Sequence, residues 1–501
     1  MSVTAIGSQS AAAIQQLVSM RAQFDELQRQ LSTGQKSSNY AGLGLTRGVT
    51  VSLNAQLSAI NGYDNTITNV MTRINLMNLS LGRIADIGNA VKSAMVQINT
   101  SGSGSGPNVA KQSAQSSLDE LLSLLNTQSG DRYLFSGRAT DQPAAETMDH
   151  ILNGNGAQAG LKQLISERTQ ADLGTAGLGR LVISLPTATS VSVAEDSISP
   201  FGLKLASVNS NLNGVSVSGP AGSPASITID TSGGIPNVGD TVTLQFTLPD
   251  GTSQNLTLTA TATVPPGVNQ FNPGPTTANT ATNLRNAITA AVTTLGATSL
   301  TAASAVAASN DFFNADSSNP PQRVNGPPFD TATSTIAGTA ANSVIWYTGE
   351  AGSDPARATA TARIDRSLSI SYGVRANEVG IRTLVQNIAT LAAVNVAPTN
   401  PNGGDLTAAL NQRLTANLNG SAGSQTVVNI QTDLSIAQTS LNVAKNRHAQ
   451  TTNTLTDYLQ QIEGVSNEEV GAQILALQTR MQASMQTTSM LYQTSLVNYI
   501  K

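Results

Sequence analysis

The chain has no cysteine, few charged residues and few aromatic residues. Of its 501 residues, 11% are Asp, Glu, Lys or Arg, and 3% are aromatic. The absence of cysteine excludes disulfides, thiolate nucleophiles and cysteine-based metal sites. The net charge of −4, with no Lys- or Arg-rich run, gives no electrostatic basis for binding nucleic acid. Ordinary domains contain roughly a quarter charged residues, so we expect a nearly neutral polar surface that suits close packing of many copies.

Long apolar runs are missing as well. No stretch approaches about 18 uninterrupted apolar residues, which argues against insertion into a membrane. Residues 1–20 contain no Lys or Arg and do not have the pattern of a cleavable secretory signal. If the protein leaves the cell, we expect an export route that does not cleave a signal.

Residues 60–98 carry the clearest positive signal, because an apolar residue fills nearly every seam position of a heptad repeat. Gly88 is the one departure. Such a stripe predicts a long helix that other helices cover. Apolar residues at spacings of three and four predict an earlier helix that ends near Thr33 and Gly34. The residues expected to pack within or between subunits are Leu17, Met20, Phe24, Leu27 and Leu31 in the first helix, and Ile60, Ile67, Ile74 and Leu81 in the second.

The helical pattern returns near the other end of the chain. One heptad seam runs from residue 427 to 462, and a last helix follows Gly464. In the first half of the chain, the flexible SGSGSGP segment at 101–107 separates the long helix from a third helix that begins near Val109. The C-terminal positions expected to pack in the same way are Leu434, Leu441, Leu455 and Ile462.

Residues 141–402 differ in character from both ends. They contain most of the 19 prolines and short alternating runs in place of long helical stripes. The alternation over 241–248, followed by a Pro-Asp-Gly turn, predicts a β-hairpin. Further expected elements are short helices over 278–294 and 377–394, and strands over 343–349 and 358–372.

The predicted fold class is α+β: a long antiparallel α-helical coiled-coil or bundle rod built from the two chain ends, with an inserted β-rich central region. The two ends pair because each carries a seam that needs a covering helix. The expected divisions are 1–45 for an N-terminal helix of a terminal, axial domain, 46–140 for the N-terminal part of the rod, 141–402 for the β-rich insertion, 403–464 for the C-terminal part of the rod, and 465–501 for a C-terminal axial helix.

Short segments near the chain ends resemble a known family. The first helix ends in LSTG at 31–34 and the third in GDRYLFSG at 130–137, and both are similar to segments of the bacterial flagellin superfamily. Together with YQTSLVNYI at 492–500, the Tyr-Leu-Phe element resembles the flagellin-type hook-associated proteins of the hook–filament junction more than filament flagellins. The resemblance covers about residues 1–145 and 403–501.

The resemblance implies a structural subunit of the flagellum that is not an enzyme and has no cofactor. It implies export by the flagellar type III system to an extracellular position, without membrane insertion or nucleic acid. The implied partners are further copies of the chain in a ring or helical oligomer, another hook-associated protein, flagellin, and a flagellar export chaperone. The residues expected to make assembly contacts are Tyr133, Leu134, Phe135, Tyr492, Leu496, Tyr499 and Ile500.

The chain departs from the family pattern at two places. Many relatives have paired aspartates after the first helix, where this chain has Ser38 to Gly42. Near the start of the last helix, Ser466 and Asn467 stand where an acidic residue is common. Asn467 is able to cap that helix ahead of Glu468 and Glu469.

Two other functions remain open from the sequence. The same fold would serve as the filament flagellin itself, which copy number distinguishes from a junction ring. An exported surface adhesin or hydrolase would use the central region, but no convergent acid, base or metal cluster is evident there. His448 sits at a seam position, which favours a packed histidine with one bonded nitrogen, and His150 beside Asp149 favours a surface pair. We therefore predict no catalytic, cofactor-binding or metal-binding residues.

Overall fold

The computed structural model describes residues 2–100, 106–396, 400–420 and 423–497. It is a mixed α+β protein with helices at both ends and a β-rich central region. The chain divides into two compact units, unit 1 from 1–70, 362–370 and 439–501, and unit 2 from 71–361 and 371–438. The divisions at 70 and 439 lie inside two long helices, α2 (Arg47–Thr100) and α10 (Val427–Glu463). The boundaries expected from the sequence lie elsewhere, because the amino-acid composition does not change at residue 70 or at residue 439.

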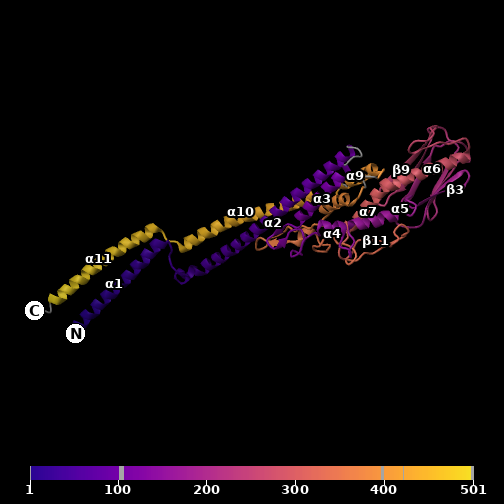
Figure 1. Ribbon diagram of the computed structural model, residues 1–501. Coiled ribbons are helices and arrows are strands. Elements are labelled where there is room, and N and C mark those ends of the chain that lie inside the picture. The colour runs from indigo at the N-terminus through magenta and orange to yellow at the C-terminus, as the bar shows by residue number, and fades with distance from the viewer. Residues whose placement is uncertain (1, 101–105, 397–399, 421–422, 498–501) are drawn as a thin grey trace. The chain divides into compact units, whose positions relative to one another are not determined.

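Unit 1 contains a pair of helices from the two ends of the chain. Helix α1 (Ser2–Thr33) and helix α11 (Asn467–Val497) lie side by side, with both chain ends at the same end of the pair (Figure 1). The segments that follow α1 and precede α11 hold the two helices together. Gln35 forms an antiparallel bridge with Gly464, and the Val465 backbone amide donates to the carbonyl of Gly34 at 3.1 Å. The short 3-10 helix η1 (Tyr40–Thr46) connects α1 to α2.

Within unit 1, α2 and α10 pack against each other through a small apolar core. Leu53 of α2 and Leu455 and Leu459 of α10 are buried there, with Ile60 and Ile462 half-buried beside them. The β13–β14 hairpin, β13 (Thr361–Arg363) and β14 (Ser369–Ser371), places its turn in the same unit.

Unit 2 contains two four-stranded sheets around helix α6 (Thr277–Leu295). One sheet has the strand order β3-β4-β7-β6 and is antiparallel, and the other has the order β10-β9-β8-β5, in which only β10 is parallel to its neighbour. Helix α6 contacts strands of both sheets, and all three share one hydrophobic core. The strands are β3 (Leu181–Thr187), β4 (Ser190–Glu195), β5 (Lys204–Ser210), β6 (Ser216–Ala221), β7 (Ser226–Asp230), β8 (Thr241–Thr247), β9 (Ser253–Ala260) and β10 (Gln270–Phe271).

The remainder of unit 2 is a packed helical region. Helix α3 packs on α8, α5 on α7, and α7 on both α8 and α9. Short strands β1 (Gln128–Ser129), β2 (Arg132–Tyr133), β11 (Arg323–Val324) and β12 (Thr335–Ile336) and the 3-10 helix η3 (Ala356–Thr359) connect these elements. The helices are α3 (Gly106–Leu125), α4 (Met148–Asn153), α5 (Leu161–Leu173), α7 (Thr301–Asn314), α8 (Val379–Ala393) and α9 (Gly403–Asn419).

Several local predictions are confirmed by the structure. The first helix ends at Thr33, and Gly34 follows with a φ of +68°, a conformation that favours glycine. The hairpin over 241–248 is present as β8 and β9, joined by a turn in which the Asp250 side chain accepts from the Thr252 amide. The helices expected over 278–294 and 377–394 are α6 and α8.

Two local predictions were wrong, and a third is confirmed only in part. Residues 343–349 form only isolated bridges to Ala145 and Ala159, because Trp346 and Tyr347 anchor this segment in the core instead of extending a sheet. Within 358–372 the expected strand structure is present as the short strands β13 and β14, but η3 precedes them and the Ile364 amide donates to the Leu368 carbonyl at 2.9 Å, so that the segment turns back on itself as a hairpin. Helix α11 is capped by Ser466, whose side chain accepts from the Glu469 amide at 3.3 Å, because Asn467 is already its first residue.

One continuous helical run, Thr277–Asn314, is long and apolar enough to span a membrane. It is joined across residues 296–300 by a π-helical segment, η2 (Gly296–Leu300). In its most apolar window 61% of the residues are buried inside the protein, among them Ile288, Val292 and Phe312. This degree of burial is typical of a helix in the core of a folded domain, here unit 2.

Candidate assembly surface

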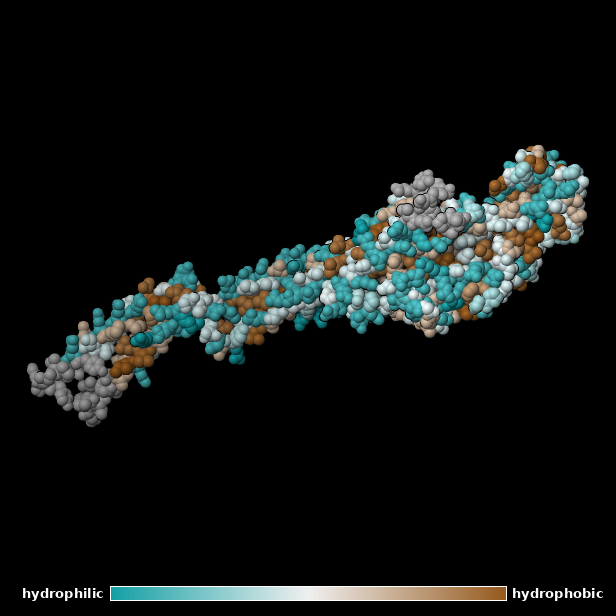
Figure 2. Space-filling model, in the orientation of Figure 1, coloured by the Kyte–Doolittle hydropathy of each residue, from teal (hydrophilic) through white to brown (hydrophobic). Residues whose placement is uncertain are grey.

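The helix pair α1–α11 leaves much of its apolar surface exposed. Among the side chains of α1 that the structure describes, Met20 is the only buried hydrophobic residue. Val18 is 64% exposed and Leu475 of α11 is 65% exposed. Figure 2 shows hydrophobic side chains on the outside of this part of unit 1. The exposed large apolar residues of the pair are Ile14, Val18, Leu31, Leu475, Met485 and Met490.

Two helices cannot cover apolar faces that point away from each other. In α1, Ile14 and Val18 are four residues apart and therefore share one face of the helix. Val470 and Leu477, the two buried hydrophobic residues in the described part of α11, account for little of that helix's apolar surface. A contiguous exposed apolar patch on a soluble protein is a feature of interaction sites. The pair therefore has the character of an incomplete bundle.

The predicted packing positions in the long helices α2 and α10 are more deeply buried than the apolar residues of the α1–α11 pair. Ile67, Ile74, Leu81, Leu434 and Leu441 are fully buried, and Leu455 is 8% exposed. In unit 2 the two helices also form a direct hydrogen bond, since Nε2 of the Gln438 side chain donates to Oδ1 of Asn75 at 2.9 Å. The seams of α2 and α10 are thus largely covered within a single chain. In the first helix Leu17, Phe24 and Leu27 are half-buried, and Leu31 is exposed.

Of the predicted assembly contacts, the structure describes the surroundings of Tyr133, Leu134 and Phe135. Tyr133 and Leu134 are half-buried in unit 2, and Phe135 is fully buried there. The Phe135 side chain is thus part of the core of the single chain and is not on its surface. Of the C-terminal set, the Tyr492 and Leu496 side chains and the residues Tyr499 and Ile500 lie outside the described residues.

The end of α1 is tied to the segment that follows it. The Arg29 guanidinium bonds the Glu26 carboxylate, with 2.9 Å between Nε and Oε2, and it also donates to the Lys36 carbonyl at 3.1 Å. The Lys36 amide donates in turn to the carbonyl of Glu463, at the end of α10, at 2.7 Å. The hydrogen bond from Arg29 lowers the pKa of the exposed Glu26 carboxyl to about 2. These bonds hold the connection from which the α1–α11 pair extends.

Replacing Arg29 is expected to raise the pKa of Glu26. In the full chain the Glu26 carboxyl should titrate at about 2, and in Arg29→Gln it should titrate near the usual glutamate value of about 4.3. Because the pKa of Glu26 is lower in the folded chain than in the unfolded chain, the ionised carboxylate stabilises the fold at pH values above the unfolded pKa. This contribution is lost as the pH falls toward about 2. Carboxyl carbon shifts in a nuclear magnetic resonance titration measure the change. Arg21→Gln is the control, and identical midpoints in Arg29→Gln and the unaltered chain would refute the assignment.

A buried histidine joins three elements of unit 1. His448 of α10 is 3% exposed, and its Nδ1 lies 2.7 Å from Oδ1 of Asp64 in α2. Its Nε2 lies 3.9 Å from Oδ2 of Asp365, in the β13–β14 turn, and makes no hydrogen bond. Arg447 bonds the same Asp365 carboxylate. His448 is therefore a packed histidine with one bonded nitrogen, as its seam position predicted.

The second histidine is also part of a local polar network. His150 lies in α4, with Nδ1 3.0 Å from Glu146 and Nε2 3.1 Å from Gln158. Within the described ranges, no group of three or more His, Asp or Glu side chains is arranged to hold a metal ion. The ring nitrogens of both histidines bond carboxylate or side-chain amide oxygens where the structure describes a partner.

Two residues of this exposed apolar surface could not be predicted from the sequence pattern. Val18 and Leu475 were not among the predicted positions, because they fall outside the apolar stripes that the sequence pattern selected. Comparison with known proteins adds no assignment: no protein-family model and no curated protein matches the chain.

Proposed function

We propose that the chain is a structural subunit of the bacterial flagellum that forms the junction between hook and filament. Its terminal helices α1 and α11 would assemble with those of neighbouring subunits, and α2 and α10 would continue as an antiparallel coiled coil. In this proposal the protein is extracellular, reaches its place through the flagellar type III apparatus, and is not an enzyme. The resemblance of the LSTG, GDRYLFSG and YQTSLVNYI segments supports the family assignment.

One observation carries the proposal, namely the exposed apolar surface of the α1–α11 pair. Residues such as Val18 and Leu475 would lose water only when other helices cover them, and burying apolar surface is worth about 25 cal/mol per Å². Obligate interfaces of this kind resemble a domain core cut in half. The low charge of the chain also favours close packing of identical copies. Folding of the ends and assembly would then be coupled.

Deletion of the gene in a motile host tests the proposed function. The junction role predicts basal bodies with hooks, filament protein shed into the medium, and loss of swimming. Loss of the bulk filament protein itself would instead identify the chain as filament flagellin, and fully normal flagella would overturn the flagellar assignment. Counting copies separates the first two outcomes, because a junction ring needs few copies and a filament needs thousands.

Removal of residues 492–501 tests the terminal contact. The truncated chain is expected to be exported but not incorporated, because it lacks the apolar positions at the end of the last helix. Incorporation is measured by immunolabelling of sheared flagella, with the full-length chain as control. Normal incorporation and swimming of the truncated chain would place the contact elsewhere.

A further inference from the structure

Methionine is the only sulfur-containing residue type of the chain, because cysteine is absent. Among the methionine side chains that the structure describes, Met485 and Met490 are the exposed ones, at 50% and 65%. Both belong to α11, one of the two helices of the incomplete α1–α11 pair. The other described methionines are buried or half-buried: Met20, Met71, Met77, Met95, Met148 and Met481. The thioethers that solutes reach most easily therefore lie on the candidate assembly surface.

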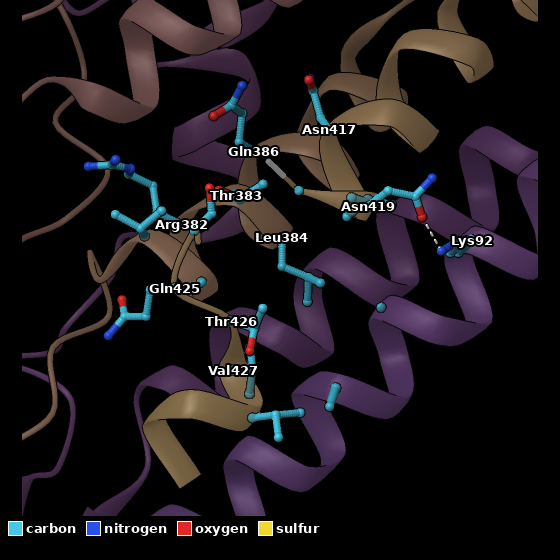
Figure 3. A pocket seen from close by; sticks show the side chains of 18 of the residues that line it. Lys92, Arg382, Thr383, Leu384, Gln386, Asn417, Asn419, Gln425, Thr426 and Val427 are labelled. Carbon is cyan, nitrogen blue, oxygen red and sulfur yellow. Dashed lines mark hydrogen bonds between the residues drawn. The ribbon is translucent and has the colours of Figure 1, made fainter. Parts of the chain in front are cut away.

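Two methionines of unit 2 are shielded from solutes by the packing around α2. Met77 and Met95 are 1% and 0% exposed. Unit 2 also contains an open cavity of about 520 Å³ beside α2 and α8, but no methionine is among the lining residues that the structure describes (Figure 3). A small oxidant in this cavity meets cationic, amide and aliphatic side chains such as Lys92, Asn417 and Leu384. These groups lack the thioether sulfur that peroxides attack.

The exposure of Met485 follows from the helical period of α11. Leu477, Met481 and Met485 are spaced by four residues, and each step of four turns the side chain by about 40° around the helix axis. Leu477 is 7% exposed, Met481 is half-buried, and Met485 is 50% exposed. Met485 therefore lies at the edge of the face that is covered within the chain, next to the uncovered surface. A helix of a second copy that covers this surface would enclose the thioether.

We propose that Met485 and Met490 form a peroxide-sensitive modification site that controls assembly. Hydrogen peroxide transfers one oxygen atom to the thioether sulfur: its O–O bond breaks, an S=O bond forms and water leaves, so that the methionine loses two electrons and the peroxide gains them. The sulfoxide is polar, and burying it against apolar neighbours is unfavourable, whereas in the single chain it stays in water. The inference rests on the proposed function, because it requires that further copies of the chain cover α11.

Peptide mass spectrometry of the full-length chain after brief treatment with hydrogen peroxide tests the modification. Met485 and Met490 are expected to gain one oxygen atom at least about tenfold faster than Met77 and Met95, since a core side chain reacts only from a rarely populated open state. Circular dichroism should show that the treated chain keeps its helices. Equal rates at the exposed and buried methionines, or loss of the helices, would overturn the proposal.

Incorporation into flagella tests the consequence of the modification. Purified chain, either treated or untreated, is added to cells of the deletion strain, and the chain bound to their hooks is counted by immunolabelling. The treated chain should be incorporated at least about tenfold less, because a buried sulfoxide oxygen is left without a hydrogen bond. Methionine sulfoxide reductase should restore incorporation, which separates sulfoxide formation from irreversible damage.

Two double variants identify the methionines responsible. Met485→Leu with Met490→Leu keeps apolar side chains of similar volume, so this chain should be incorporated equally well before and after peroxide treatment. Met71→Leu with Met148→Leu, at half-buried positions of unit 2, should remain as sensitive as the unaltered chain. Undiminished incorporation of the treated unaltered chain, or loss of incorporation in the treated Met485 and Met490 variant, would overturn this inference alone. Failure of the untreated chain to bind hooks would overturn the proposed function and this inference with it.

Discussion

The double substitution Ile14→Lys with Val18→Lys is expected to abolish assembly while leaving the single chain folded. Both residues are exposed, at 49% and 64%, and they share one face of α1. In the monomer the new lysines would remain in water, so the free energy of unfolding should change by no more than about 0.5 kcal/mol. In an assembled bundle, two ammonium groups would have to lose water against apolar neighbours, which costs several kcal/mol at each contact.

Swimming and electron microscopy of a deletion strain that carries the variant measure this effect. The matched control is Gln15→Lys with Ser19→Lys, which adds the same two charges to the same helix at exposed polar positions. The control should assemble and restore swimming. Normal assembly of the apolar-face variant would show that this face of α1 is not an interface, and failure of both variants would show that added charge alone disrupts the helix.

Arg323→Met is expected to destabilise unit 2 by about 3–5 kcal/mol. Arg323 bonds the Glu167 carboxylate, with 2.9 Å between Nε and Oε2, and also donates to the Asn342 carbonyl at 2.8 Å. The Glu167 side chain is only 2% exposed. Removing the guanidinium would leave a buried carboxylate without its counter-charge, which is much more costly than losing an exposed ion pair.

Urea unfolding measures this loss, because the single tryptophan, Trp346, is fully buried in unit 2 and its fluorescence reports on that unit. The double variant Arg323→Met with Glu167→Leu should recover most of the lost stability, since no charge then remains buried. Arg83→Met removes one partner of the exposed Arg83–Glu120 pair and should leave the urea midpoint unchanged. A single variant as stable as the unaltered chain would contradict the assigned role of Arg323.

Much of the helical structure could be predicted because its signals are local. The seams of α2 and α10 repeat an apolar residue every three or four positions, and Thr33 with Gly34 ends α1 by backbone preference alone. Helix α7 was missed for the corresponding reason. Its buried residues are mostly small, including Ala302, Ala305 and Ala308, so no stripe of large apolar side chains reveals it.

The candidate sites depended on contacts between residues far apart in the sequence. The seam pattern selected Leu17 and Leu27, but which apolar residues of α1 remain exposed is decided by how α11 covers it.

By itself the sequence determined that the chain is α+β, that its first helix ends near Thr33, that a last helix follows Gly464, and that the two long helices α2 and α10 carry apolar seams. Those properties follow from hydrophobic periodicity and backbone preference, which act over a few neighbouring residues. Only the tertiary structure decided that the seams of α2 and α10 are largely covered within one chain and that the α1–α11 pair is left partly uncovered. Burial depends on which distant segments pack together, and a local pattern does not contain that information.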